Sequence, residues 1–245
     1  MKRFYHPDTL EINQNIYLGD LAAHHALQVM RVKVKDRFIV FNGDGYNYKV
    51  EVIGVEKKKL KINVISKNEN YSESQMKITL IQSLSTNEKM DWIIQKATEL
   101  GVNQIIPIYS TRSIIKLDST RADKKLMHWQ QVLISACEQS GRSKIPQIYK
   151  PTSFIQALEK SKFNEKTLKL ILTPNGQVSL ENLGPLNNKE IVLLIGPEGG
   201  FSEEELKLAN DYKFTPLKLG PRILRTETAP LSILSIIQFK YGDLS

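Results

Sequence analysis

The stretch 191–232 constrains the fold of this chain more than any other part of its sequence. Residues 191–195 are apolar and rich in β-branched side chains, which is typical of a strand buried on both faces. Residues 196–200 have the sequence G-P-E-G-G and exclude a helix or a regular ladder, because glycine is too flexible and proline lacks an amide donor. Ser202 and Glu205 then have the spacing of a capping box, which predicts that a helix starts there.

A second strand and a second loop follow the same pattern. Residues 216–219 are predicted to form a short strand, and residues 220–228 form another loop that begins with Gly-Pro. A final helix is expected after this loop, because Pro230 is tolerated in a first turn and apolar residues follow it. An open α/β sheet binds its ligand at the edge where the strands end. The sequence therefore predicts a ligand site built from both loops.

The first of these loops favours a ligand that carries little negative charge. Its G-P-E-G-G sequence is neither the dinucleotide motif G-x-G-x-x-G nor a P-loop, and no lysine follows to meet a phosphate. Glu198 inside the loop would repel an anion. The loop is therefore predicted to contact its ligand through the backbone, and a tight turn that only connects strand and helix is the alternative.

The rest of the chain divides by pattern into a mostly β part and an α/β part. Residues 1–66 contain short strand candidates and turn residues at 42–45, which predict a small barrel. Residues 66–75 are polar and are predicted to form a linker. From Met76 onward strands alternate with helices, which predicts a parallel sheet with helices on both faces. The expected strands are 3–5, 16–18, 37–41, 46–55, 60–65, 77–83, 102–109, 168–173, 191–195 and 216–219, and the expected helices are 21–29 (capped by Asp20), 89–100, 121–139, one capped by Ser153, and 230–240.

Composition narrows the class of protein. The net charge of +8 and an isoelectric point near 9.3 favour an anionic partner such as nucleic acid or a membrane surface. A single cysteine excludes a disulfide framework and fits a reducing compartment. The four histidines and Cys137 lack zinc-ligand spacing, so no metal site is expected. Because no run of apolar residues is long enough to cross a bilayer, we expect a cytosolic protein with no membrane partner.

Five segments together resemble one known family. Residues 194–205, L-I-G-P-E-G-G-F-S-E-E-E, and residues 219–229, L-G-P-R-I-L-R-T-E-T-A, are similar to the paired signature of the ribosomal RNA small subunit methyltransferase E family. Residues 24–33, 89–101 and 138–142 are similar to three further motifs of that family, the last with the sequence E-Q-S-G-R. The resemblance thus covers nearly the whole chain.

The resemblance implies a fold that periodicity alone does not predict. The family belongs to the SPOUT class, so residues 73–245 are expected to form a methyltransferase domain with a parallel sheet and a C-terminal trefoil knot. Residues 1–72 are expected to form a PUA-like or OB-like RNA-binding β-barrel. Periodicity by itself predicts only a doubly wound α/β sheet, and general topology rules argue against knots.

The resemblance also implies an activity, a cofactor and partners. The expected enzyme uses S-adenosylmethionine to methylate N3 of a uridine in 16S ribosomal RNA of the small subunit, in the cytoplasm. It is expected to work as a homodimer joined through the final helix (230–240) and the knot loops. The alternatives are a SPOUT methyltransferase acting on another RNA or position, and a non-catalytic RNA-binding protein of ribosome assembly. The residues expected to hold the cofactor are Thr173, Ile195, Gly196, Pro197, Glu198, Gly199, Gly200, Leu219, Gly220, Ile223, Leu224, Arg225 and Thr226.

Candidate residues for chemistry and for RNA binding come from the same segments. Arg225 is the candidate for stabilising a developing uracil anion, and Glu198 and Glu227 are the candidates for accepting the proton; a salt bridge that braces the loop is the alternative role for Arg225. The candidate RNA contacts are Arg3, His24, Arg31, Lys33, Lys89, Lys96 and Arg142. For the last five, solvated or helix-capping charges are the alternative.

Overall fold

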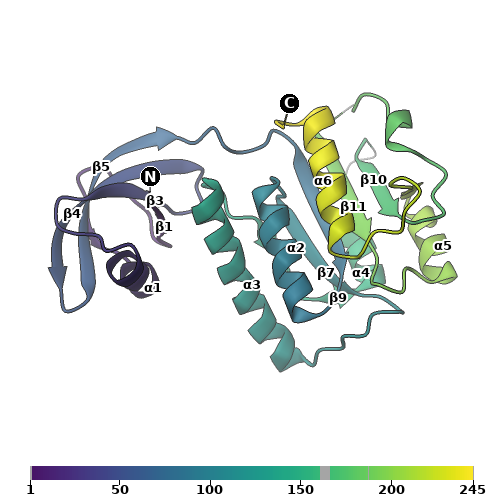
Figure 1. Cartoon of the computed structure of the whole chain (residues 1–245), viewed down its shortest axis with the longest axis horizontal. Coiled ribbons are helices and arrows are strands. Elements are labelled where there is room, and N and C mark those ends of the chain that lie inside the picture. Colours follow the sequence, from purple (N-terminus) through teal and green to yellow (C-terminus); the bar gives the residue numbers. More distant parts are fainter. Residues whose placement is uncertain (1, 161–165, 187, 245) are drawn as a thin grey trace. The chain divides into compact units, whose positions relative to one another are not determined.

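The computed structural model describes residues 2–160, 166–186 and 188–244, and the chain divides into two compact units (Figure 1). The first unit contains Met1–Glu73 together with Cys137–Ile145, and the second contains Ser74–Ala136 together with Pro146–Ser245. The E-Q-S-G-R segment therefore belongs to the first unit, although it lies far along the chain from the rest of that unit.

The first unit is built on a five-stranded sheet. Its hydrogen-bonded order is β1-β3-β4-β5-β2, in which β1 is parallel to β3 and the other neighbours are antiparallel. The strands are β1 (Arg3–Tyr5), β2 (Asn15–Tyr17), β3 (Arg37–Phe41), β4 (Tyr46–Glu56) and β5 (Lys59–Glu69). The predicted strands are thus present with small shifts, and closure into a barrel stays a prediction.

Turn chemistry explains how β3 connects to β4. Gly43 and Gly45 have φ angles of 95° and 93°, a backbone region that glycine adopts without strain. The hairpin predicted at 42–45 is therefore confirmed by both its residues and the antiparallel pairing of β3 with β4. The sheet covers a core that includes Phe4, Phe38 and Tyr48, all buried.

Two predictions in the first unit were wrong in detail. Helix α1 (Asp20–His24) has Gly19 rather than Asp20 at its N-cap, and it passes into a π-helical turn, η1 (His25–Val29). The polar linker was placed too early, because β5 continues to Glu69 and pairs there with Tyr46. Polar side chains did not prevent this strand from extending, since β4 supplies the backbone partners that the ladder needs.

The second unit is built on a parallel sheet, as the alternation of strands and helices predicted. The order is β12-β10-β11-β6-β7-β8, with β9 also paired to β7, and every recorded pair is parallel. The strands are β6 (Lys77–Ser83), β7 (Gln104–Tyr109), β8 (Gln147–Ile148), β9 (Thr152–Ser153), β10 (Leu168–Leu172), β11 (Glu190–Ile195) and β12 (Thr215–Leu217). Strands β11 and β12 flank β10, so the loops that follow all three leave the same edge of the sheet.

Helices cover the sheet of the second unit. One buried cluster joins α4 and α5 to side chains of the central strands, including Ile81, Val192 and Leu194. Helix α2 packs against α6, and the two lie side by side in Figure 1. The helices are α2 (Asn87–Glu99), α3 (Ser119–Ser140), α4 (Phe154–Lys160), α5 (Glu203–Asp211) and α6 (Thr228–Tyr241), with a 3₁₀ turn η2 (Leu180–Asn182).

The predicted helix caps of the second unit are confirmed. The Ser202 side chain accepts a hydrogen bond from the Glu205 amide, and the Glu205 carboxylate accepts one from the Ser202 amide, which completes the capping box of α5. Ser153 accepts a hydrogen bond from the Gln156 amide at the start of α4. The chain therefore turns from β11 into α5 immediately after the glycine-rich loop.

Candidate functional site

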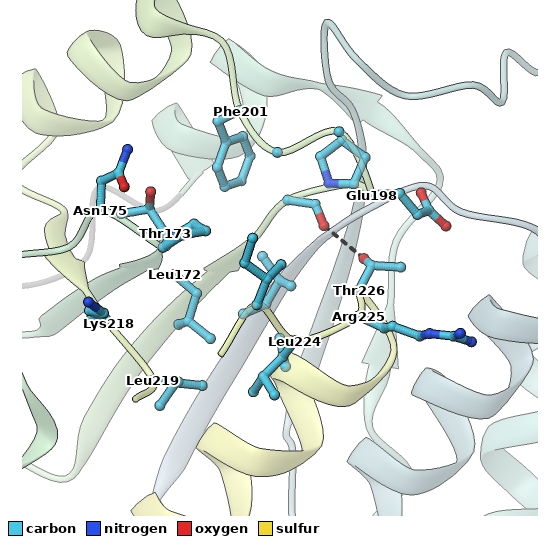
Figure 2. Close-up of a pocket in the computed structure, with 18 of the residues that line it drawn as sticks. Leu172, Thr173, Asn175, Glu198, Phe201, Lys218, Leu219, Leu224, Arg225 and Thr226 are labelled. Carbon is cyan, nitrogen blue, oxygen red and sulfur yellow. Dashed lines mark hydrogen bonds between the residues drawn. The ribbon is translucent and has the colours of Figure 1, made fainter. Parts of the chain in front are cut away.

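One cavity of about 580 Å³ lies where β10, β11 and β12 end. It is formed mainly by two loops, which we call the first loop (residues 196–202) and the second loop (residues 218–227). All the residues that the sequence assigned to the cofactor line this cavity. In Figure 2, Leu172, Leu219 and Leu224 lie along the lower side of this pocket and Phe201 along the upper side. The two loops thus line one open space that has both apolar and charged side chains.

A buried threonine fastens the two loops together. Thr226 of the second loop donates a hydrogen bond from Oγ1 to the Gly196 carbonyl oxygen at 2.8 Å, drawn as the dashed line in Figure 2. The same Oγ1 accepts a hydrogen bond from Gln82 Nε2 at 3.2 Å. Because Thr226 is only 5% exposed, these bonds are shielded from water. Gln82 was missed by the sequence analysis, although a polar residue near the end of a buried strand was a usable signal.

Glycines permit the loop backbones at two positions. Gly200 in the first loop has a φ of 67°, and Gly220 in the second loop has a φ of 70°. A third glycine, Gly176, allows close packing, because a Cβ built there would lie 2.5 Å from the backbone carbon of Leu217. Gly176 follows β10 and was not identified from the sequence. It lets the chain after β10 lie directly against the end of β12.

The first loop is anchored by an ionic network. Glu198 Oε1 accepts hydrogen bonds from Ser85 Oγ at 2.6 Å and from Lys89 Nζ at 2.7 Å. Lys89 Nζ also lies 3.6 Å from Glu227 Oε2, so one lysine forms ion pairs with carboxylates of both loops. Burial alone would raise the pKa of Glu198, but the hydrogen bonds from Lys89 and Ser85 outweigh burial and lower it. The carboxylate inside the first loop is therefore ionised and already neutralised by a neighbour.

The three candidate residues for chemistry lie around this network. Glu198 and Glu227 share Lys89, while Arg225 Nη1 lies 3.9 Å from Glu227 Oε1. The Arg225 side chain is 83% exposed, and Figure 2 shows it extending away from Leu172 and Leu219, on the same side of the view as Glu198. Its guanidinium is thus open to a second molecule, and the salt bridge proposed as its alternative role is long.

The predicted RNA-binding residues fall into two groups. Four of them use their charged groups inside the protein. Lys89 serves the network above, Lys96 contacts Glu99 at 2.8 Å, and Arg142 is 3% exposed and contacts Glu73 at 2.9 Å. Arg3 hydrogen-bonds to Asn47, to Ser143 and to the Arg142 carbonyl, and burial lowers its pKa. These contacts favour a structural role for Arg3 and Arg142. His24, Arg31 and Lys33 are exposed.

Several residues that line the pocket were not singled out from the sequence. Arg112 follows β7, Pro174 and Asn175 follow β10, and Lys218 follows β12. The rule that parallel strands end at a common edge would have found them, because each lies just beyond a strand end. Within the ranges 2–160, 166–186 and 188–244, no group of three or more His, Cys, Asp or Glu residues is arranged to hold a metal ion. No helix of those ranges is long and apolar enough to span a bilayer.

Comparison with known proteins identifies the family. Residues 72–238 match the family described as RNA methyltransferase domain, and residues 18–65 match the one described as RNA methyltransferase PUA domain. The ribosomal RNA small subunit methyltransferase E of Buchnera aphidicola from Schizaphis graminum is 38% identical over 99% of this chain and 98% of its own length. The chain belongs to the ribosomal RNA small subunit methyltransferase E family. It is therefore an RNA methyltransferase, and the resemblance found in its motifs is confirmed.

Other members of the ribosomal RNA small subunit methyltransferase E family agree in sequence and in structure. The Bacillus subtilis relative is 34% identical over 89% of this chain and 87% of its own length. A crystal structure of the Neisseria gonorrhoeae family member bound to S-adenosyl methionine superposes with a TM-score of 0.93, at 37% identity and with 100% of both chains covered. The family match also shows that the first unit contains a PUA-type domain.

Proposed function

We propose that this protein binds S-adenosylmethionine in the pocket and transfers its methyl group to N3 of a uridine in 16S ribosomal RNA. The observation that carries the proposal is that both family loops line one cavity and are tied together by the bond from Thr226 to Gly196. The S-adenosyl methionine in the related Neisseria gonorrhoeae structure supports the choice of cofactor.

The pocket fits this cofactor in size and in chemistry. Its volume of about 580 Å³ falls within the range of small-molecule sites, which are mostly apolar with a few placed polar groups. Ile195, Leu219 and Ile223 offer apolar surface for an adenine ring, and the backbone of Leu219 and Leu224 offers hydrogen-bond partners. Lys89 neutralises Glu198, the one acidic residue among the described residues that line the pocket. Backbone contact with a ligand of little negative charge, as the sequence predicted, is therefore favoured.

The chain's own task in catalysis is alignment and charge stabilisation. When bound, S-adenosylmethionine supplies an activated methyl group on a sulfonium centre. Uracil N3 carries a proton at neutral pH, so negative charge develops on the ring oxygens as that proton leaves. The exposed guanidinium of Arg225 offers fixed donors to such an oxygen, at the side of the pocket where Glu227 lies.

Of the two candidate proton acceptors, Glu227 is favoured over Glu198. Hydrogen bonds from Lys89 and Ser85 lower the pKa of Glu198 below its ordinary value, despite the opposing effect of burial, which makes it a weaker base. Glu227 holds its lysine less closely: Lys89 Nζ lies 3.6 Å from Glu227 Oε2, which accepts no hydrogen bond from the described residues, but 2.7 Å from Glu198 Oε1. Glu227 Oε1 lies beside Arg225, 3.9 Å from its Nη1, so this carboxylate is in a better position to receive a proton from bound uracil.

The architecture that the family implies completes the proposal. Residues 73–245 would form the SPOUT domain, with the second loop and α6 completing the trefoil knot. Two copies would pair through α6, whose exposed Phe239 leaves apolar surface uncovered in one chain. Residues 1–72 would bind the RNA through exposed His24, Arg31 and Lys33. The enzyme would act in the cytoplasm, where the small ribosomal subunit is found.

Methyl transfer to defined RNA tests this function. The full-length protein is incubated with S-adenosylmethionine and small ribosomal subunits from cells that lack its gene, and nuclease digests of the 16S RNA are analysed by mass spectrometry. We expect one new 3-methyluridine. If the methyl group were instead found on a ribose 2′-oxygen or on transfer RNA, the protein would be a SPOUT methyltransferase with another target. Absence of any transfer, together with no cofactor binding in calorimetry, would leave only an RNA-binding role.

A further inference from the structure

The cations that line the pocket fall into two groups. Lys89 is neutralised by Glu198 and Glu227, at 2.7 and 3.6 Å. Arg112, Lys218 and Arg222 line the same cavity and are exposed. None of these three forms an ion pair with another described residue; only a weaker electrostatic effect links Arg112 to Glu204. The pocket lining therefore carries these three positive charges in addition to Lys89, which belongs to the ionic network with Glu198 and Glu227.

Arg112 is held in place beside the first loop. Its Nη1 donates a hydrogen bond to the Gly199 carbonyl oxygen at 2.9 Å, and the residue as a whole is exposed. The neighbouring Thr111 amide donates to Glu205 Oε1 at 2.8 Å, which fixes the loop after β7 against the start of α5. Lys218 and Arg222 belong to the second loop. The three cations thus border the pocket from two directions.

The N-terminus of α5 does not offer a second anion-binding site beside these cations. The N-terminus of α5 adjoins the first loop, but Glu203, Glu204 and Glu205 occupy its first turn and already compensate the helix dipole. Hydrogen bonds from its own backbone and from Ser202 lower the pKa of Glu204, and the charge of Arg112 adds a smaller effect in the same direction. Bound S-adenosylmethionine carries two positive groups and one carboxylate, so it does not require three more cations. A polyanion does.

We propose that Arg112, Lys218 and Arg222 form a phosphate-binding rim that holds the RNA backbone beside the nucleotide to be methylated. This inference rests on the proposed function, because RNA is the polyanion that must reach the pocket mouth in that reaction. Contacts with phosphates fix the position of an RNA without reading its sequence. The rim positions the target uridine, whereas the groups around Glu227 act on its base.

Charge-removing variants with matched controls test the rim. The variants are Arg112→Gln, Lys218→Gln, Arg222→Gln and their combination. Lys207→Gln on α5 removes one exposed charge outside the pocket and serves as the control. The full chain is titrated with unmodified 16S RNA over a range of salt concentrations, and S-adenosylmethionine binding is measured by calorimetry. Thermal unfolding shows whether each variant is folded.

The expected result separates the rim from the cofactor site. Each rim variant should lose about fivefold in RNA affinity at about 0.1 M salt and about 0.7 from the slope of log affinity against log salt, and the triple variant about 100-fold. The cofactor affinity of Lys218→Gln and Arg222→Gln, and both affinities of Lys207→Gln, should stay at the parent level. If the triple variant kept the RNA affinity and the salt slope of the parent protein, the proposed phosphate-binding rim would be wrong, while the proposed function would stand. Weakened cofactor binding without a change in the RNA slope would assign the cations to the cofactor carboxylate instead. If the parent itself transferred no methyl group, the proposed function would fail first.

Discussion

The two loops of the pocket differ in how firmly the chain holds them. The first loop is fixed through side chains of other elements: Glu198 is bound by Ser85 and Lys89, and the Gly199 carbonyl oxygen is bound by Arg112. In the second loop, residues 219–224 form no hydrogen bond with other described residues, and residues 220–223 are exposed. Only its ends are fastened, by the bonds from Lys218 to Val178 and from Thr226 to Gly196.

This contrast indicates that the first loop is preorganised, whereas the second loop can adjust its conformation. A loop that is already fixed loses no conformational entropy when a ligand arrives, whereas a loop held only at its ends becomes ordered through contact with the ligand. We therefore expect the first loop to set the position of the cofactor, and the second loop, which carries the candidate residue Arg225, to close on it. Variants in the two loops should separate these roles.

Arg225→Lys tests the second loop at its point of greatest effect. Lysine keeps the charge but lacks the fixed fork of donors, so the rate of methyl transfer should fall roughly 100-fold, the scale of losing one oxyanion donor. Cofactor affinity in calorimetry should be unchanged, because the side chain is 83% exposed and extends away from the apolar part of the pocket. The rate should partly recover at higher pH, where uracil ionises unaided. A parent rate at neutral pH would make Arg225 a scaffold residue.

Gly220→Val tests whether the second loop depends on its backbone shape. At a φ of 70° a β-branched residue is strained by about 1–3 kcal/mol, so the loop must move and cofactor affinity should fall about tenfold or more. Gly184→Val is the matched control: neither site has an atom within 4 Å of an added Cβ, but Gly184 has no positive φ. Equal calorimetric affinities for the two variants would show that the loop shape is not needed.

Thr226→Val removes the link between the loops while keeping the side-chain shape. The Gly196 carbonyl oxygen then loses its partner in a buried place, so the free energy of unfolding should fall by about 1–3 kcal/mol in urea denaturation. Thr228→Val, at the exposed start of α6, should change it by less than about 0.5 kcal/mol. A stable Thr226→Val protein would mean that the two loops are held together by packing instead.

Ile223→Ser asks whether an exposed residue becomes covered by the cofactor. Because Ile223 is 83% exposed, its replacement should alter the free energy of unfolding by less than about 0.5 kcal/mol. If the second loop closes on the adenine, cofactor affinity should nevertheless fall about fivefold, as expected when a partly buried apolar side chain is lost. Unchanged affinity in calorimetry would place the adenine away from this residue.

Acidification should loosen the first loop, with the smallest effect of the five. The pKa of Glu198 is lowered from its ordinary value of 4.5, because the bonds from Lys89 and Ser85 overcome the effect of burial. A lowered pKa in the folded state contributes stability that is present above pH 4.5 and is lost as the pH falls further through the folded value. Glu198→Gln should therefore flatten the fall in unfolding temperature between about pH 5 and pH 3. The side chain is 35% exposed, so solvent screening keeps this difference small.

Local sequence patterns determined the strands, the start of α5 and the two loops of the pocket. Continuous apolar runs predicted strands buried in a parallel sheet, the spacing of Ser202 and Glu205 predicted the start of α5, and the two glycine-containing loops predicted a shared site. These features depend on neighbouring residues, whose conformational limits can be read directly from the chain.

Only the tertiary structure decided which groups meet across long separations. Nothing local in the sequence indicates that Lys89 bridges Glu198 and Glu227, that Gln82 reaches Thr226, or that Arg142 is buried against Glu73. Each of these polar contacts depends on two segments that are brought together by burial of apolar side chains elsewhere. A charged side chain that appears solvated in the sequence can thus become a structural ion pair. Hydrophobic periodicity determines the elements, while the pairing of charges follows from where those elements finally pack.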